Sequence, residues 1–291
     1  MLNDLVESAY RMFAVYPAPE DLGCSYALSK LGEGQSRLKA LAVRDIPDEL
    51  LWHYHFTAHA EKTPVAEIKH FLPRYLEIVS RFQFKHFWTE IALSHLIFAG
   101  STWTAEERAL LETWARAFFA HCLSRYYDRE LFPDAPYIEN IVDIIIMLAH
   151  GAFDVPPLLD DWRKDNRLSA LLHFKDLLLW GFNKDMNALE NSFAEDDQAL
   201  LETLSDWVRQ PGVAAHFVEA CDKAIASPEP ILAMANGFHA GRTHLEELKI
   251  VRQRLGPQRQ GSLEQPPLRR AASSRRKAGR EGGQISGAKR R

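Results

Sequence analysis

The sequence predicts an all-α protein: an irregular multi-helix stack of roughly ten to twelve helices, joined by short loops and followed by a disordered basic C-terminal tail. Apolar residues recur at spacings of three and four through most of the chain, which is the period of an amphipathic helix. No stretch alternates as a strand does, and no Asn-Gly or Asp-Gly turn separates two apolar runs. The 46% hydrophobic and 25% charged residues are ordinary globular values. We expect a helical domain over 1–255 and a tail over 256–291.

The segment 64–100 has the densest apolar pattern and is the expected centre of the core. Its first stripe predicts a helix and consists of Val65, Ile68, Phe71, Leu72, Tyr75, Leu76 and Val79. Pro73 lies inside this stripe. Because proline lacks an N–H and crowds the carbonyl four residues back, we expect a kink or a break near 70–72. A second helix, joined to the first at 83–85 as an antiparallel hairpin, is predicted by the stripe Phe84, Phe87, Trp88, Ile91 and Leu96.

The remaining helices are predicted from apolar stripes that are bounded by capping residues, glycines and prolines. One start is a capping box, with Thr104 at the N-cap and Glu107 three residues into the helix. The run 137–148 is rich in β-branched residues and could equally be a buried strand; we expect a helix because polar residues share its other face. The predicted helices outside the hairpin span 2–15, 36–43, 45–58, 104–126, 137–148, 168–180, 195–208, 211–225 and 228–251.

Charge divides the chain into an acidic body and a basic tail. Residues 257–291 contain ten Lys and Arg and two acidic residues, a net charge of +8. The first 256 residues contain 25 Lys and Arg and 37 Asp and Glu, a net charge of −12. An acidic body attracts a basic partner and repels nucleic acid. The tail has almost no apolar residues, so we expect it to be disordered. It is either an arm for nucleic acid or acidic surfaces, or dispensable; its lack of interleaved aromatic residues favours the second interpretation.

Cysteine usage and hydropathy indicate a cytoplasmic protein. The three cysteines, Cys24, Cys122 and Cys221, form no closely spaced pair, which favours a reducing compartment. Cys122 and Cys221 lie on apolar stripes, where buried and inert thiols are expected. Acidic residues interrupt the N-terminal apolar run, so we expect no signal peptide. The longest apolar run, 144–149, is far short of the ~20 residues of a membrane helix, so we expect no membrane contact.

No group of residues specifies a reaction, and we assign no catalytic residue, no metal and no cofactor. His55 and His59 stand four residues apart, but zinc needs three or four ligands. Glu67 and His70 match one half of a di-iron carboxylate motif, and the sequence has no second half. His95 lies on an apolar stripe and is expected to be a core histidine with satisfied hydrogen bonds. Nucleotide-binding loops and nucleophile elbows are also absent from the sequence.

Clustered acidic residues are the candidates for contact with a partner. Paired carboxylates can serve acid–base chemistry, and at helix starts and in loops they are often only solvated. The net charge of −12 on the first 256 residues favours a third interpretation, an acidic binding surface. The partner-binding residues predicted on this basis are Asp128, Glu130, Asp134, Asp160, Asp161, Glu195, Asp196 and Asp197.

Three short segments give the chain a family resemblance. The run Lys69–Glu77 reads KHFLPRYLE, and it is followed by TEIAL at 89–93 and WTAEE at 103–107. These segments resemble a family of uncharacterised bacterial helical proteins with an FLPR-x-LE core, some of which are encoded beside secreted polymorphic toxins. The resemblance covers residues 17–125 and implies a cytoplasmic helical protein with an immunity role. Family members often carry a cysteine-rich stretch before the core, where this chain has only Cys24.

We therefore expect a cytosolic immunity protein. It would bind a basic toxin domain, one that acts on nucleic acid, and occlude the toxin's active site through its acidic surface. Two other functions stay open. A helical enzyme, either metal-dependent or a hydrolase that reverses a modification, requires several of Glu67, His70, Glu90, His95 and His59 to converge. A nucleic-acid-associated adaptor would use the basic tail, and outside that tail we do not expect nucleic acid to bind.

Overall fold

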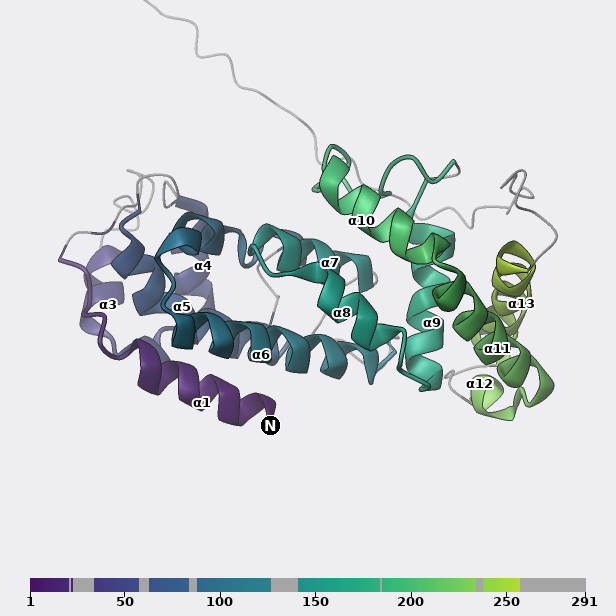
Figure 1. The fold of residues 1–291 in the computed structure, drawn as a ribbon. Coiled ribbons are helices and arrows are strands. Elements are labelled where there is room, and N and C mark those ends of the chain that lie inside the picture. The colour runs from purple at the N-terminus through teal and green to yellow at the C-terminus, as the bar shows by residue number, and fades with distance from the viewer. Residues whose placement is uncertain are drawn as a thin grey trace, which may run out of the picture.

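A computed structural model describes residues 1–20, 22, 34–57, 63–83, 88–126, 141–183, 185–233 and 238–256. Within these ranges the chain forms twelve α-helices, three 3-10 helices and one π-helical turn, and it has an isolated β-bridge but no sheet. The predicted all-α class is confirmed. Figure 1 shows the helices stacked irregularly along an elongated body, roughly in chain order. The predicted tail lies outside the described residues.

The N-terminal part of the body is built around two long helices that pack on the first helix of the chain. Its elements are α1 (Leu2–Phe13), α3 (Gly34–Ala40), η1 (Val43–Asp45), α4 (Asp48–Thr57), α5 (Val65–Ser80) and α6 (Ala105–Leu123). Helix α1 is amphipathic and buries Val6, Ala9 and Phe13. It packs against both α5 and α6, and in Figure 1 it runs beside α6. These contacts remove its apolar stripe from water.

Helix α5 runs unbroken through Pro73, so of the kink or break predicted near 70–72 the break does not occur. A proline in a helix interior removes one backbone hydrogen bond and costs ~3 kcal/mol. In this helix twelve of the sixteen residues are buried. At ~25 cal/mol per Å² of apolar surface, burial over such a length outweighs the loss of one bond.

The end of α5 is fixed by a left-handed residue, Phe82, whose φ is 55°. Its N–H donates to the carbonyl of Val79 over 3.0 Å, and the N–H of Gln83 donates to the carbonyl of Ile78 over 3.1 Å. This pair of bonds closes a Schellman cap. The backbone conformation is unfavourable for a bulky side chain. The Phe82 ring is held against Phe118, with 5.5 Å between the ring centroids, and this packing stabilises the turn.

The second arm of the predicted hairpin is not an α-helix. It consists of two 3-10 helices, η3 (Thr89–Ile91) and η4 (Ser94–Thr102), and residues 84–87 lie outside the described ranges. Trp88, which the apolar stripe placed in the core, is 54% exposed. The β-branched residues of η3 and the Gly-Ser-Thr sequence that closes η4 have low helix propensity, which favours short 3-10 turns over a continuous α-helix.

The middle of the chain supplies a buried layer between the two ends of the body. Its elements are α7 (Ile141–His150), α8 (Val155–Trp162), α9 (Leu168–Asp176) and the π-helical η5 (Leu177–Gly181). The choice of helix over strand for the β-branched run is correct in its described part, which is α7. A Cβ on Gly181 would lie 2.7 Å from Cγ2 of Val142. The close approach of η5 to α7 therefore requires glycine at this position.

The C-terminal part is assembled on an aromatic cluster. Its elements are α10 (Gln198–Arg209), α11 (Pro211–Ala226), α12 (Glu229–Ala233) and α13 (Phe238–Leu255). The rings of Phe174 and Phe217 stack with centroids 3.5 Å apart, and Trp162 and Trp207 pack beside them. The segment predicted as one last helix contains α12 and α13, with 234–237 undescribed between them. None of the described helices combines the length and apolar character needed to cross a bilayer.

The N-terminal end of α6 is tied to α5 and α1 through Glu107. The predicted capping box is confirmed: the Glu107 N–H donates to Thr104 Oγ1, and the Thr104 N–H donates to Glu107 Oε2. Lys69 Nζ lies 2.6 Å from Glu107 Oε2, and the side chains are only 3% and 5% exposed. Tyr16 donates its hydroxyl to Glu107 Oε1 over 2.6 Å, and Lys69 also donates to the carbonyl of Thr102. This buried ion pair is therefore surrounded by further hydrogen bonds.

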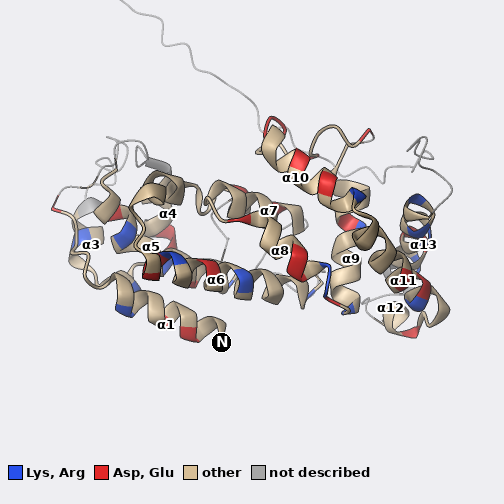
Figure 2. Cartoon of the chain, in the orientation of Figure 1, with Lys and Arg blue, Asp and Glu red and all other residues tan. Residues whose placement is uncertain are grey.

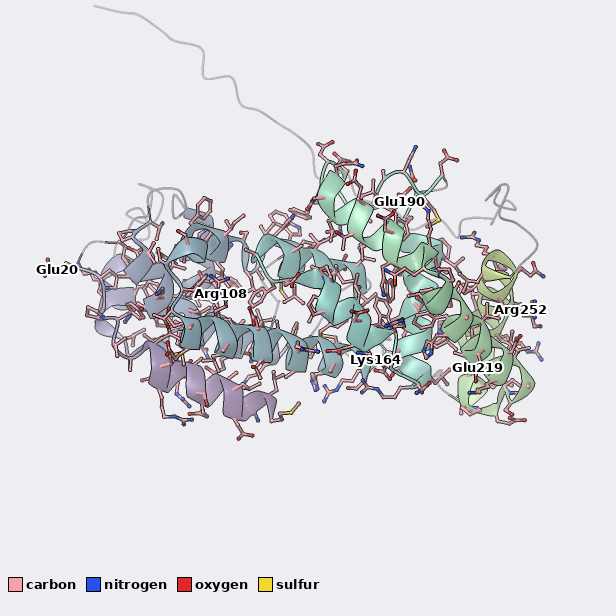
Figure 3. All side chains as sticks on the ribbon, viewed as in Figure 1. Glu20, Arg108, Lys164, Glu190, Glu219 and Arg252 are labelled. Atoms are coloured by element: carbon pink, nitrogen blue, oxygen red, sulfur yellow. The ribbon has the colours of Figure 1, made fainter. Side chains whose placement is uncertain are left out.

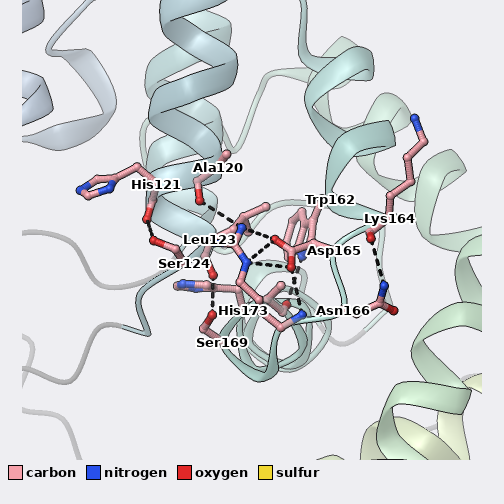
Figure 4. Close-up of polar contacts among 12 residues, drawn as sticks. Ala120, His121, Leu123, Ser124, Trp162, Lys164, Asp165, Asn166, Ser169 and His173 are labelled. Atoms are coloured by element: carbon pink, nitrogen blue, oxygen red, sulfur yellow. Dashed lines mark hydrogen bonds and ion pairs between the residues drawn. The ribbon is translucent and has the colours of Figure 1, made fainter. Parts of the chain in front are cut away.

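The C-terminal end of α6 is capped by residues at the start of α9 (Figure 4). Ser169 Oγ donates to the carbonyl of Leu123 over 2.6 Å, and His173 Nε2 donates to the carbonyl of Arg125 over 2.6 Å. The guanidinium of Arg167 adds a bond to the carbonyl of Ala120. The last carbonyls of a helix have no partner within the helix, so these side chains join α6 to α9.

Replacing Lys69 by methionine should lower the free energy of unfolding by about 3 kcal/mol, because Glu107 would stay buried without its cation. Urea unfolding of Lys69→Met would measure the loss. The control is Lys223→Met, since Lys223 pairs with Glu219 on the surface, where the two side chains are 72% and 68% exposed. An exposed ion pair contributes about 0–1 kcal/mol to the free energy of unfolding. Equal losses in the two variants would show that the Lys69 pair does not anchor the fold.

Candidate functional site

One cluster of titratable side chains lies buried between α4, α5 and η4. It comprises Tyr54 and His55 from α4, Glu67 and Tyr75 from α5, and His95 from η4. Tyr54 donates its hydroxyl to Glu67. His55 Nε2 donates to the carbonyl of Ile91, as a neutral imidazole can, and its ring stacks on that of His95 with centroids 3.9 Å apart.

Burial keeps the two histidines of this cluster neutral. Desolvation lowers the pKa of His55 well below its ordinary value, and it lowers the pKa of His95 to about 4. Burial, together with the charge of Glu67, raises the pKa of Tyr75. The cavity that Tyr54, His55, Tyr75 and His95 line has a volume of about 10 Å³, which is space for one water molecule. The cluster is therefore closed to a substrate in this conformation.

The residues named for an enzyme converge only in part. Glu67 and His95 enter the buried cluster. His70 instead donates from Nδ1 to the carbonyl of Tyr16 over 2.9 Å, and Glu90 accepts a hydrogen bond from Asn191. His59 lies outside the described residues. Within the described part of the chain, no three His, Cys, Asp or Glu side chains are grouped as metal ligands.

The acids predicted on α8 are paired with cations. Asp161 lies 2.7 Å from Arg116 and 3.9 Å from Lys164, and Asp160 lies 3.6 Å from Arg163. Their charge is thus balanced locally, which weakens the case for them as contacts with a basic partner. The predicted residues Asp128, Glu130 and Asp134 lie outside the described ranges.

Asp161 also lines a groove of about 320 Å³ between α6 and α8. A second groove of about 500 Å³ lies between α9 and α11 and shares Arg167 with the first. The turn between α8 and α9, with Lys164 and Asp165, separates them (Figure 4). The charged rim residues form pairs with one another, Arg167 with Asp165 and Lys223 with Glu219. Each groove is lined by one more cation than carboxylate, a charge too small to select a ligand by itself.

The acids predicted before α10 differ from those on α8. Asp197 caps α10, because its side chain accepts a hydrogen bond from the N–H of Leu200 over 3.0 Å. Glu195 and Asp196 are exposed and form no ion pair with any described residue. Their charge faces solvent and is available to a partner.

These residues belong to a longer run that we call the acidic segment, 185–206. It has no lysine, arginine or histidine, and its acids are Asp185, Glu190, Glu195, Asp196, Asp197, Glu202 and Asp206. All of them except the half-buried Asp197 are exposed. Acidic side chains mark α10 and the loop before it in Figure 2, and Glu190 is labelled beside α10 in Figure 3. The segment concentrates negative charge on one surface.

Asn191 fastens the loop that carries the first half of the acidic segment. Its side-chain amide donates to Glu90 over 2.9 Å and to Asp143 over 3.0 Å, two carboxylates that are 8% and 3% exposed. Its side-chain oxygen accepts the N–H of Phe193, and the Phe193 ring lies 5.7 Å from that of Trp88. The exposed ring of Trp88 therefore packs on the half-buried ring of Phe193, which lies two residues before the exposed Glu195.

Comparisons of the chain with protein-family models, with curated proteins and with solved structures found no match. The family resemblance stays a prediction. The residues that carry it meet in space: Lys69 of the first segment binds Glu107 of the third, and Glu77 binds Arg74 and Tyr10. These segments build the contacts between α1, α5 and α6, whereas the exposed acids come from elsewhere in the chain.

Acid should destabilise the fold through the stacked histidines. Because its pKa is lowered in the folded protein, His95 binds fewer protons in the folded state than in the unfolded state. Its contribution to the free energy of unfolding is therefore complete above pH 6.5 and is lost as the pH falls toward about 4. We expect the free energy of unfolding to fall by about 2–3 kcal/mol over that window. Urea unfolding at half-unit pH steps measures it. His95→Phe keeps a stacked ring that cannot bind a proton, so the slope of the free energy of unfolding against pH should be smaller in this variant. An unchanged slope would contradict the assignment of the pH dependence to His95.

Proposed function

We propose that this protein is a cytosolic immunity protein that binds a basic toxin domain and neutralises it by covering its active site. The observation that carries the proposal is the acidic segment, which holds seven carboxylates and no basic residue over 185–206. A toxin that acts on RNA or DNA presents positive charge to phosphate groups. A row of carboxylates can occupy the same surface as the phosphates would.

Electrostatics also favours rapid binding. A surface with concentrated charge of one sign steers an oppositely charged partner and raises the association rate by 10–10³-fold at low ionic strength, in order of magnitude. Speed matters for an inhibitor that must act before a toxin damages its target. The net charge of −12 on the first 256 residues adds a long-range attraction to the local one.

The loop before α10 is held in place before any partner arrives. The N–H of Glu190 donates to the carbonyl of Gly181 over 3.0 Å, and the N–H of Asn183 donates to the carbonyl of Ala188 over 2.9 Å. Asn191 adds the bonds to Glu90 and Asp143. A surface that is already ordered loses little conformational entropy on binding, so more of its interaction energy contributes to affinity.

The buried cluster of Tyr54, His55, Glu67, Tyr75 and His95 supports binding over catalysis. It brings together groups that could exchange protons, but its cavity of about 10 Å³ admits no substrate. The acidic segment, in contrast, is open to solvent. This contrast supports the proposal of a binding protein.

The proposal is tested by affinity capture with the full-length protein from lysate of its own cells, at low and high salt and after nuclease treatment. We expect a basic protein at one-to-one stoichiometry that resists nuclease, dissociates at high salt and arrests growth when expressed alone. Co-expression of the bait should restore growth. Recovery of nucleic acid alone would support the adaptor function of the tail instead, and a partner that does not impair growth would exclude immunity.

Charge reversal at the acidic segment should weaken capture. We expect the double variant Glu195→Lys/Asp196→Lys to bind the partner at least about tenfold less tightly, mainly through slower association. The control Glu112→Lys/Glu219→Lys makes the same change in net charge at exposed positions on α6 and α11. Surface plasmon resonance at two salt concentrations separates the variants. Equal losses would show that only net charge matters and that the acidic segment is not the contact.

A further inference from the structure

We propose that Trp88 and Phe193, with the neighbouring Glu195 and Asp196, form a docking point for an arginine side chain of the partner. We call these four residues the Trp88 patch. This inference rests on the proposed binding of a basic protein and names the chemistry that the surface recognises. It predicts that the protein distinguishes arginine from lysine at equal charge.

The aromatic half of the patch consists of one exposed ring, Trp88, and one half-buried ring, Phe193. Trp88 is 54% exposed, and its ring contacts that of Phe193 at 5.7 Å with an interplanar angle of 48°. A large exposed aromatic surface is unfavourable in water. In monomeric proteins such surface often marks an interaction site, and tryptophan is enriched among the residues that dominate binding energy.

The acidic half of the patch decides the class of partner. Glu195 and Asp196 follow Phe193 by two and three residues and are exposed. An arginine guanidinium is planar and weakly hydrated, so it can stack on an aromatic ring while its N–H groups donate to a carboxylate. A lysine ammonium is compact and strongly hydrated, and it gains less from the ring. An exposed indole that packs on Phe193, with exposed carboxylates two and three residues further along the chain, therefore fits arginine best.

The two aromatic residues come from distant parts of the chain, and the side chain of Asn191 links the two segments. Glu90 lies in η3, two residues after Trp88, and it accepts a hydrogen bond from Asn191. The side-chain oxygen of Asn191 accepts the N–H of Phe193 over 2.9 Å. The link from Glu90 through Asn191 to Phe193 thus joins the two segments that carry the rings. A preformed site of this kind costs little entropy on binding.

The experiment compares deca-arginine and deca-lysine peptides as probes of the full-length protein by isothermal titration calorimetry at fixed ionic strength. We expect wild type to bind deca-arginine about tenfold more tightly than deca-lysine. Trp88→Ala should remove this preference while leaving the affinity for deca-lysine unchanged, and Trp88→Phe should keep part of it. The control is Trp180→Ala, because Trp180 is a second exposed tryptophan, 46% exposed, outside the patch. It should keep the full preference.

The outcomes separate this inference from the proposed function. If both peptides bind equally and Glu195→Lys/Asp196→Lys weakens both, the acidic surface is real and the arginine site is wrong. If Trp88→Ala and Trp180→Ala reduce the preference alike, the Trp88 patch is not its source. If neither peptide binds wild type, both the inference and the proposed attraction to a basic partner are overturned.

Discussion

The arrangement of the molecule depends on the need to satisfy both ends of α6. A helix of 19 residues leaves its first N–H groups and its last carbonyls without internal partners. At one end Glu107 closes the capping box and draws in Lys69 of α5 and Tyr16 after α1. At the other end Ser169 and His173 supply donors from α9. The N-terminal and C-terminal parts of the body are thereby attached to opposite ends of one axis.

Charged residues have different roles in the interior and on the surface. Buried ionic groups are used for attachment: Lys175, only 2% exposed, pairs with Asp176 and Glu247 and so joins α9 to α13, just as Lys69 joins α5 to α6. Removing either partner of such a pair is costly, which makes these groups structural. The acidic segment, in contrast, holds six carboxylates that form no ion pair with any described residue, and its seventh, Asp206, lies 3.9 Å from Arg209. A surface rich in one sign of charge destabilises a fold slightly through self-repulsion, and it is retained where a partner of opposite charge binds.

Most of the fold could be predicted from the sequence, because helical periodicity, prolines and the Thr104 capping box report local preferences directly. The helix break predicted near Pro73 does not occur because tertiary packing outweighs a single local penalty. The prediction that Trp88 lies in the core was wrong because an apolar stripe does not show which of its residues stay exposed to solvent. Composition named Glu195 and Asp196 among the acids, yet no local signal separates them from Asp161, whose partner Arg116 is distant in sequence. Asn191 had no signal at all, since its role comes only from contacts across the fold.

The part played by the Asn191 side chain in holding the loop before α10 makes this loop sensitive to chemical damage. Asparagine is among the thermally labile residues. Hydrolysis of the Asn191 side chain would release ammonia and leave a third carboxylate facing Glu90 and Asp143, so two hydrogen bonds would become two repulsions. The loop would come loose while the rest of the helices kept their packing. A sample stored warm would then keep most of its helical content, and the loop that carries the first half of the acidic segment would be the first part of the surface to change.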